Sequence, residues 1–258
     1  MKIPKIIHYC WFGGTPLPEK EQACIASWKQ FFPDYEIKFW NEETFDLSSA
    51  PLFAKQAYEL KKYAFVSDYV RVKVLHDFGG IYFDTDVQVL ARFDSILNNE
   101  GFLGFENSKR VGTATMAFMP HHPLMAKFLQ YYTMHPFIDK NGNADITANV
   151  TILTDILTEQ GFVGNGQQQN INGVVVYPRD WFSPKKMNET DFNISPNTLA
   201  IHKFSCSWLS EKQKKRGNNW LWLKIVRPLL QKGRAIGLKL IGKERIRNLE
   251  IIIRNKLK

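Results

Sequence analysis

Two carboxylates separated by one residue, Asp84 and Asp86, form a pattern suited to binding a metal ion. They follow Gly79, Gly80 and a β-branched and aromatic run at 81–83, which predicts a strand. Side chains alternate along a strand, so both carboxylates should point to one side, and their oxygens are ligands that Mg²⁺ or Mn²⁺ prefers. At the end of a strand in an open α/β sheet, they would lie where ligands bind. A cation there could neutralise a diphosphate, although the same pattern on a surface turn is only two solvated acids.

The segment before this motif, residues 64–78, predicts a helix. Its apolar residues recur at helical spacing, and Gly79 stops the pattern as a C-terminal glycine does. Asp68 and Arg71 lie three residues apart, so they share one face and can form an ion pair. Such a pair is usually an ordinary surface contact. This helix, however, is apolar on most of its circumference and should be buried, and a buried charged pair needs a partner or a function.

Three blocks of the sequence resemble a known family. They are Ser67-Asp68-x-x-Arg71 with Gly79-Gly80-x-Tyr82-x-Asp84-x-Asp86, the opening at 3–14, and the late block at 200–208. The family is that of the bacterial and fungal glycosyltransferases of family 32, whose sugar-binding region contains a DXD motif. It includes capsular polysaccharide, mannosyl- and galactosyltransferase members, and the large clostridial glucosylating toxins carry a related core. The blocks occur in the same order and cover most of residues 1–210.

The alternation of strand and helix patterns predicts an α/β sheet with helices on both faces. Strands are expected at 5–9, 36–40, 81–83, 102–105, 115–119, 174–177 and 199–202, and helices at 18–31, 51–63, 64–78, 123–132 and 149–160. The resemblance implies a GT-A-type, Rossmann-like mixed sheet that binds a nucleotide sugar. Loops at 106–114, 135–148 and 163–173 are rich in Gly, Asn and Gln and could close over ligands.

Composition and charge divide the 258 residues into a body and a tail. A hydrophobic fraction of 44%, with 19 Phe and 7 Trp, is ample for a packed core. Residues 211–258 hold 15 Lys or Arg and 3 Glu; the totals of 34 basic and 25 acidic residues leave 19 and 22 in residues 1–210. We therefore expect a catalytic domain over 1–210 and basic amphipathic helices over 211–258.

The tail mixes apolar anchors, such as Trp220 and Trp222, with cations. This mixture is typical of interfacial helices on an anionic membrane surface. An alternative is a solvated basic helix that packs its apolar side on the body. Nucleic acid is not an expected partner, because no recognised reader motif accompanies the charge.

Cysteine usage and the start of the chain bear on location. Cys10, Cys24 and Cys206 are widely spaced and odd in number, which suits a reducing compartment better than a disulfide framework or a zinc site. Lys2 and Lys5 interrupt what would be the apolar stretch of a signal peptide, and no run approaches the length of a membrane span. We expect a cytoplasmic protein that is peripheral at the inner face of the cell membrane.

The resemblance implies a metal site and a lid. Asp86 would be the main direct ligand of Mn²⁺ (or Mg²⁺), Asp84 would lie between the metal and the donor, and His202 would be the third protein ligand. A lone His at a strand end is, however, more often structural. Ser207 and Trp208 would form a flexible lid over the diphosphate, unless Trp208 is simply part of the core.

Four further side chains would contact the donor in the same interpretation. Arg71 would offset the charge of the leaving group, while Asp68 would orient the donor sugar. Tyr82 could line the donor pocket or merely pack. Asn149, near the start of a helix, could reach the donor sugar, although the local match there is poor.

The first and late blocks are less firmly assigned. His8 and Trp11 would belong to the loop that holds the base, with Trp11 stacked on it; the alternative for Trp11 is core packing. Lys203 and Cys206 depart from many relatives and leave the contacts of the late block open.

The resemblance implies a metal-dependent, retaining hexosyltransferase. It would move a hexose from a nucleotide-diphosphate sugar, with UDP-sugars favoured over GDP-mannose, to a glycan or polyprenyl-diphosphate-linked acceptor in surface polysaccharide synthesis, as for capsule or O-antigen. A departing diphosphate and an oxocarbenium-like sugar need charge stabilisation, which a cation and a guanidinium supply. No carboxylate stands out as a nucleophile, so a front-face mechanism fits better, by analogy alone. The alternatives are a metal-dependent phosphoesterase and a non-enzymatic membrane- or nucleic-acid-binding protein.

Overall fold

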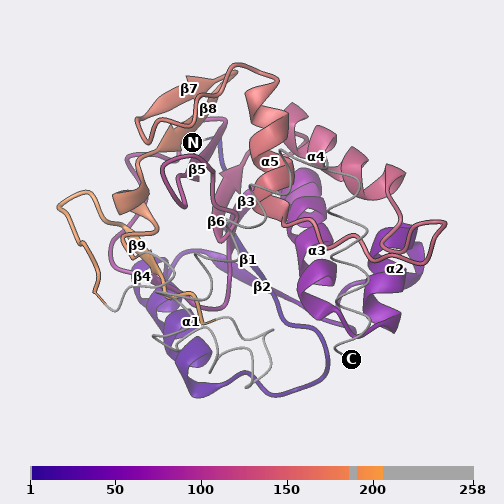
Figure 1. The fold of residues 1–258 in the computed structure, drawn as a ribbon. Coiled ribbons are helices and arrows are strands. Elements are labelled where there is room, and N and C mark those ends of the chain that lie inside the picture. Colours follow the sequence, from indigo (N-terminus) through magenta and orange to yellow (C-terminus); the bar gives the residue numbers. More distant parts are fainter. Residues whose placement is uncertain (1, 186–190, 206–258) are drawn as a thin grey trace, which may run out of the picture. The chain divides into compact units, whose positions relative to one another are not determined.

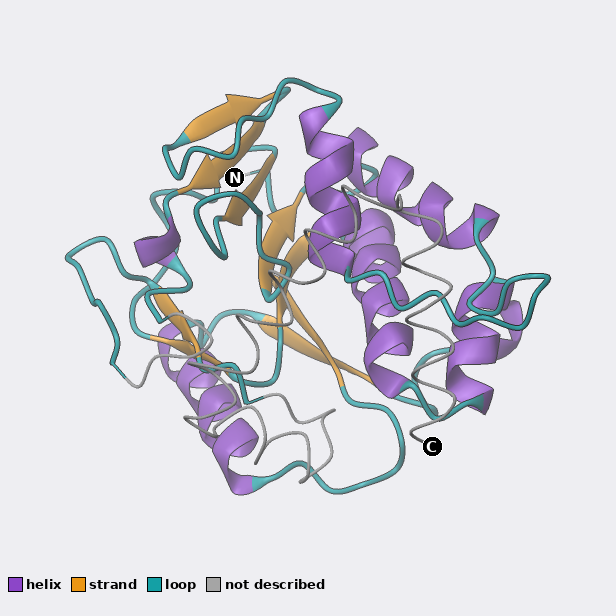
Figure 2. Cartoon of the chain, viewed as in Figure 1, coloured by secondary structure: helices purple, strands orange, loops and turns teal. Residues whose placement is uncertain are grey.

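The computed structural model describes residues 2–185 and 191–205, which belong to one compact unit (Figures 1 and 2). Its strands are β1 (Ile6–Cys10), β2 (Glu36–Trp40), β3 (Gly80–Phe83), β4 (Val87–Val89), β5 (Gly101–Gly104), β6 (Thr115–Phe118), β7 (Gln169–Ile171), β8 (Val174–Tyr177) and β9 (Ala200–His202). Its helices are α1 (Glu19–Phe31), α2 (Leu52–Glu59), α3 (Tyr63–Phe78), α4 (Pro123–Met134) and α5 (Asn149–Thr158), with short 3₁₀ turns η1 (Leu47–Ser49) and η2 (Arg179–Trp181).

The main sheet is mixed and has the strand order β2-β1-β3-β6-β5-β8-β7. Strands β2, β1 and β3 run parallel, and β6 is antiparallel to both of its neighbours, β3 and β5. Strand β5 therefore points the same way as β1 and β3, so their carboxyl ends meet at one edge. A separate two-stranded sheet pairs β4 with β9.

Helices cover both faces of the sheet, which confirms the predicted α/β class. One core cluster joins sheet residues such as Tyr82 to helices α2 to α5, and the other joins Ile81 and Phe83 to α1 and β4. Neighbouring residues of β3 thus enter opposite cores, as the alternation of a strand requires. In Figure 1, α2 to α5 lie together on one side, and α1 with β4 and β9 on the other.

The glycine pair after α3 sets how β3 enters the sheet. Gly79 has a φ of +63°, and Gly80 has a φ of +100°. A Cβ at Gly80 would lie 2.5 Å from the carbonyl oxygen of Ile6, and one at Gly79 would lie 2.7 Å from the backbone nitrogen of Pro120. Only glycine fits both the backbone conformation and the close approach, so the predicted helix stop is confirmed.

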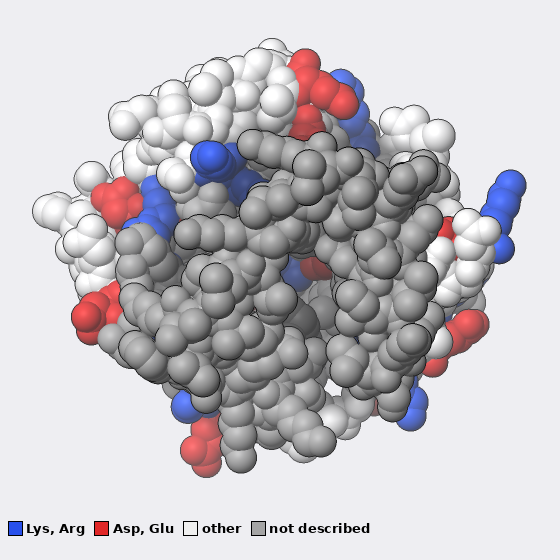
Figure 3. All heavy atoms as spheres, in the orientation of Figure 1, with Lys and Arg blue, Asp and Glu red and all other residues white. Residues whose placement is uncertain are grey.

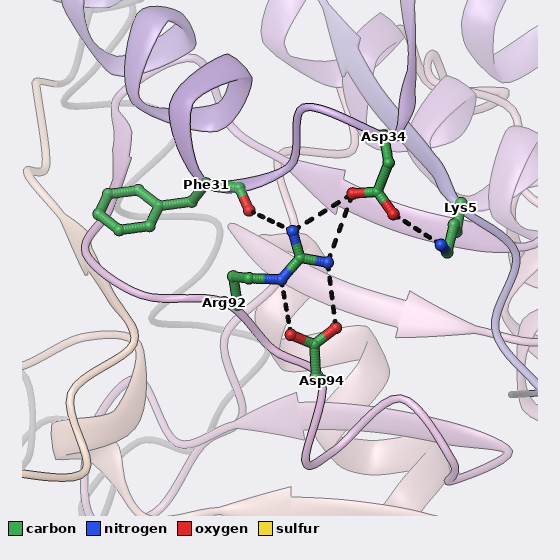
Figure 4. A network of polar contacts seen from close by, with 5 residues as sticks. All are labelled: Lys5, Phe31, Asp34, Arg92 and Asp94. Atoms are coloured by element: carbon green, nitrogen blue, oxygen red, sulfur yellow. Dashed lines mark hydrogen bonds and ion pairs between the residues drawn. The ribbon is translucent and has the colours of Figure 1, made fainter.

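A surface network ties α1 to the chain after β4 (Figure 4). The guanidinium of Arg92 donates to both carboxylate oxygens of Asp94, to Asp34, and to the carbonyl oxygen of Phe31 at 3.1 Å. Lys5 pairs with the other oxygen of Asp34 at 2.6 Å. These side chains are solvated, so the network should add little to stability.

The largest differences from the predicted elements concern short strands. Strand β4 was not expected, and the late strand pairs with it rather than joining the main sheet. The loop expected over 163–173 is wrong in part, because Gln169–Ile171 forms the edge strand β7 against β8. Gln169 and Asn170 are polar because an edge strand bonds through its backbone and can leave side chains in solvent, whereas Ile171 is buried in the core.

Charged side chains are interspersed on the face drawn in Figure 3, where described basic and acidic groups lie near one another around the margin. Among the described residues, no helix is both long and apolar enough to cross a membrane. The helices predicted over 211–258 lie outside the described residues, and the division of the chain at residue 210 stays a prediction.

Candidate active site

The two carboxylates of the DXD motif lie at the edge where β1, β3 and β5 end. Asp84 directly follows β3, and Asp86 precedes β4, whose Val87 is paired with His202 of β9. This pairing brings the His202 imidazole to the motif, with Nε2 3.4 Å from Oδ1 of Asp86. One ligand atom from each of Asp84, Asp86 and His202 lies within 4.8 Å of the others.

Asp86 and His202 shift each other's pKa. Burial alone would raise the pKa of Asp86, but His202 and the backbone N–H of Ser205, which donates to Oδ2 at 2.7 Å, hold that pKa below its usual value. Burial would lower the pKa of His202, but the nearby Asp86 and Asp84 carboxylates raise it. With no cation bound, the pair therefore favours an imidazolium beside a carboxylate.

The chemistry of the three side chains fits a hard divalent cation. Two carboxylates and one imidazole are a donor set that Mn²⁺ or Mg²⁺ accepts. The Nδ1 atom of His202 is buried and has no hydrogen-bond partner in the described part of the chain. A cation would replace the proton that the imidazole shares with Asp86, since a ligating His must be neutral.

Arg71 connects helix α3 to the DXD motif. It is 6% exposed, and its Nη1 lies 3.1 Å from Oδ1 of Asp84 and donates to the carbonyl oxygen of Thr113 at 3.1 Å. Its Nη2 lies 3.0 Å from Asp68, and its guanidinium sits 4.7 Å from the ring centre of Tyr82. Burial opposes the charge, but Asp84 and the other acids raise the Arg71 pKa, so the guanidinium stays charged.

Asn149 belongs to the same network. At the start of α5, its Nδ2 donates to Oδ1 of Asp68 at 2.6 Å, and its Oδ1 accepts from the hydroxyl of Thr113 at 3.0 Å. Burial raises the pKa of Asp68 to about 7, although Arg71 lowers it. The hydroxyl of Tyr82 donates to Asp84 at 3.0 Å.

The structure therefore gathers seven of the predicted site residues into one cluster. They are Asp68, Arg71, Tyr82, Asp84, Asp86, Asn149 and His202. Their contacts are now defined, whereas their roles toward a ligand stay predictions.

His8 does not join this cluster, which corrects the expectation that it contacts the base. Its ring is fully buried and packs against Trp40 and Phe78, with ring centres 6.0 and 6.2 Å away. Nδ1 accepts from the indole N–H of Trp40 at 3.1 Å, so Nε2 carries the proton and donates to the carbonyl oxygen of Gly79 at 2.8 Å. Both ring nitrogens are engaged, and burial lowers the His8 pKa to about 4. His8 is a core residue that joins β1 to the end of α3.

Three further predicted site residues belong to the first and late sequence blocks. Trp11 follows β1 at the same edge, half-buried, and its indole N–H donates to the carbonyl oxygen of Thr15 at 2.7 Å. Its contact with a base stays a prediction. Ser207 and Trp208 lie outside the described residues.

The sequence interpretation missed one acid, Glu106. It lies two residues after β5, the strand that ends at the same edge as β3. Burial raises its pKa, His202 and Arg110 lower it and Asp84 raises it further, so its carboxylate senses both Asp84 and His202. Its place at the start of the predicted loop 106–114, directly after an expected strand, was the signal available in the sequence.

Comparison with known proteins finds similarity to glycosyltransferases over part of the chain. Residues 18–103, about a third of the chain, match the profile of the family described as "Glycosyltransferase sugar-binding region containing DXD motif". "Inositol phosphoceramide mannosyltransferase 3" of Schizosaccharomyces pombe is 30% identical over 135 residues, which cover 50% of this chain and 36% of that protein. "Mannosyl phosphorylinositol ceramide synthase CSH1" of Saccharomyces cerevisiae is 30% identical over 140 residues, covering 50% and 35%. The chain spans about a third of the length of these relatives.

Among solved structures, "PaToxG Glycosyltransferase" is similar with a TM-score of 0.49 and 20% identity, covering 62% of this chain and 69% of that one. The α/β class follows from the strand order and the helix layers of the chain itself. The chain is thus similar, over a third to a half of its length, to a glycosyltransferase family profile and to these two relatives.

Proposed function

We propose that this chain is a GT-A-type glycosyltransferase that transfers a hexose, with retention, from a nucleotide-diphosphate sugar and depends on Mn²⁺ or Mg²⁺. The observation that carries the proposal is the convergence of Asp84, Asp86 and His202 at the carboxyl edge of β3, beside the buried Arg71. A diphosphate is a leaving group of high charge, and this site combines a cation-binding set with a fixed guanidinium.

The cation would be held by Asp86 and His202, with Asp84 turned toward the donor. When bound, it supplies positive charge that neutralises the diphosphate oxygens. Arg71 adds a second positive group, and its guanidinium is held by Asp68, Asp84 and the Thr113 carbonyl before any ligand arrives. Such preorganised charge costs no reorganisation during the reaction.

Asp68 and Asn149 would orient the donor sugar. Their side chains are joined at 2.6 Å on the α3 and α5 side of the motif, and both are polar groups that bind hydroxyls well. Trp11, at the end of β1, would lie under the base. The nucleotide would then run along the sheet edge from β1 to β3, in the crevice where open α/β sheets bind ligands.

For the donor and acceptor, we propose a UDP- or GDP-linked hexose and a lipid-linked or glycan acceptor. Two relatives are named for mannosyl transfer to inositol-containing ceramides, which adds weight to GDP-mannose and to an acceptor anchored in a membrane. The basic residues of 211–258 suit an anionic membrane surface. We therefore propose a peripheral protein at the inner face of the cell membrane, acting in surface polysaccharide or glycolipid synthesis.

The test is turnover and binding of donors by the full chain. Purified protein is incubated with UDP-glucose, UDP-galactose and GDP-mannose, each with and without Mn²⁺, and nucleotide release is measured. We expect Mn²⁺-dependent hydrolysis of at least one donor. Asp86→Asn should lower it about 100-fold or more without unfolding the protein, whereas the exposed Asp155→Asn should not change it.

Two results would contradict the proposed glycosyltransferase activity. A folded wild-type protein that neither hydrolyses nor binds any of these donors would overturn the proposal. Release of phosphate from simple esters, with no attack on nucleotide sugars, would support a phosphoesterase instead.

A further inference from the structure

Glu106 follows β5, and none of the proposed donor-binding residues belongs to that strand. Strand β5 runs parallel to β3, so the chain leaves β5 at the edge where Asp84 and Asp86 lie. A turn then fixes Glu106: Phe105 bridges to Val111, and the backbone N–H of Glu106 donates to the carbonyl oxygen of Arg110 at 2.9 Å. The turn thus fixes the backbone of Glu106.

The other three acids of the site already have hydrogen-bond or ion-pair partners. Asp68 binds Arg71 and Asn149, and Asp84 binds Arg71 and the Tyr82 hydroxyl. Asp86 accepts from the Ser205 backbone and faces His202. In residues 2–185 and 191–205, by contrast, the Glu106 carboxylate makes no hydrogen bond or ion pair.

Glu106 lies close to the cation-binding set without belonging to it. Its charge is coupled to His202 and Asp84, and its partial burial strengthens that coupling. Yet the group of side chains whose ligand atoms converge on one point contains Asp84, Asp86 and His202 only, among the described residues. Glu106 therefore borders the site where a diphosphate would bind and is free to contact something else there.

The strand order indicates what that contact is. In the order β1-β3-β6-β5, the base would lie over β1 and the diphosphate at the end of β3. The next position along the edge, toward β6 and β5, is left for the transferring sugar. Glu106 follows β5 and so lies toward this end of the edge, away from β1.

We propose that Glu106 is the catalytic nucleophile of a double-displacement reaction, an inference that rests on the proposed function. An oxygen of Glu106 forms a bond to C1 of the sugar while the bond from C1 to the diphosphate oxygen breaks, and the diphosphate leaves with the electron pair. The acceptor hydroxyl then bonds to C1, the ester bond to Glu106 breaks, and the hydroxyl proton passes to the departing diphosphate or to water. Two inversions at C1 give net retention.

The first test traps the bond. Wild-type protein with Mn²⁺ is incubated with 2-deoxy-2-fluoro analogues of the same UDP- and GDP-hexoses, which slow hydrolysis of a glycosyl ester. Peptide mass spectrometry should then show one added fluorohexosyl group on the peptide containing Glu106, and Glu106→Gln should show none. An adduct on another residue, or none on a wild-type protein that is inactivated by the analogue, would overturn the assignment.

The second test is chemical rescue of Glu106→Ala with azide, beside the exposed Glu159→Ala as the matched control. We expect Glu106→Ala to lose about 10³-fold in donor hydrolysis and to regain at least tenfold with azide. The product from an α-linked donor should be the β-glycosyl azide, because a single displacement inverts C1. Glu159→Ala should keep wild-type rates with no azide effect.

Several results would reject the nucleophile while leaving the proposed function intact. One is Glu106→Ala hydrolysis within threefold of wild type. Others are a rise in acceptor KM with kcat unchanged, or loss of Mn²⁺ binding in Glu106→Gln, either of which assigns the side chain elsewhere. If Glu106→Ala does not fold, Glu106→Gln carries the same test by trapping. A folded wild type that binds no donor rejects both proposals together.

Discussion

Arg71 and Asp84 form an ion pair of 3.1 Å between the middle of α3 and the end of β3. The same guanidinium lies 3.0 Å from Asp68 and bonds to the Thr113 backbone at 3.1 Å. One side chain therefore connects the buried helix, the strand that carries the DXD motif, and the segment that leads into β6. The first carboxylate of the motif is held in place before any cation or donor binds, which is the condition for electrostatic preorganisation.

Replacing Arg71 should destabilise the protein strongly. Arg71→Ala leaves Asp68 and Asp84 without their common positive partner inside the protein, and we expect a loss of about 3 kcal/mol in the free energy of unfolding. Urea unfolding followed by circular dichroism measures it. The control is Arg92→Ala, which also removes an arginine with two aspartate partners but from a solvated surface, so it should cost much less. Equal losses in the two variants would show that burial of the Arg71 network is unimportant.

Cation binding should be visible without any turnover. Mn²⁺ at about 100 times its dissociation constant should stabilise the folded wild type by about 2.7 kcal/mol, detected as a rise in melting temperature that EDTA reverses. Asp86→Asn and His202→Ala should abolish the rise because each removes a ligand. Asp155→Asn and His135→Ala, both exposed, are matched controls and should keep it. A rise that persists in both ligand variants would place the cation elsewhere.

Gly80 and Gly161 have nearly the same φ, so replacing each of them distinguishes backbone strain from steric overlap with neighbouring atoms. Gly80 has a φ of +100° and a Cβ there would lie 2.5 Å from the Ile6 carbonyl oxygen, whereas Gly161 has a φ of +98° and open space around it. Gly161→Ala should cost about 1 kcal/mol from backbone strain alone. Gly80→Ala should cost at least about 2 kcal/mol more, because β1 and β3 must separate. Similar denaturation midpoints for the two variants would contradict the close packing described at Gly80.

The buried His8 should make stability depend on pH. Its folded pKa of about 4 lies below the ordinary 6.5, so the unfolded state binds more protons between these values and stability rises with pH. The contribution is complete above pH 6.5 and is lost as the pH falls toward 4, by about 3 kcal/mol in total. His122, whose pKa is also lowered by burial, acts in the same direction.

Asp68, with a pKa raised to about 7, acts in the opposite direction over the same pH range, so the test compares two proteins rather than reading one curve. His8→Phe keeps a buried ring and removes the titration. The free energy of unfolding of wild type should fall relative to this variant between pH 6.5 and 4.5. Parallel curves for the two proteins would argue that His8 titrates normally.

The basic tail should govern membrane association. Deleting 211–258 removes a net charge of +12, from 15 basic and 3 acidic residues. Sedimentation with vesicles of anionic phospholipid should therefore drop sharply, while hydrolysis of a soluble donor changes little. Neutral vesicles and high salt serve as controls, since both should release the full chain. Unchanged sedimentation of the truncated protein would reject the membrane role.

Local pattern was enough to predict the elements that carry the motif. The helix over 64–78, its glycine stop and the strand before Asp84 are all present, because spacing and backbone preference act between near neighbours. The pairing of Asp68 with Arg71 followed from helix geometry in the same way. The resemblance in three blocks pointed to His202, although no local pattern explains why it should meet Asp86.

Tertiary structure decided the rest, for one physical reason: contacts between distant segments depend on strand order and register, which periodicity does not encode. Pairing of β4 with β9 brings His202 to Asp86, and the parallel course of β5 brings Glu106 to the same edge. Packing against Trp40 and Phe78 buries His8, which the resemblance had assigned to the loop that holds the base. The sequence by itself determined that two carboxylates in the DXD pattern follow a strand, while the fold determined which side chains surround them.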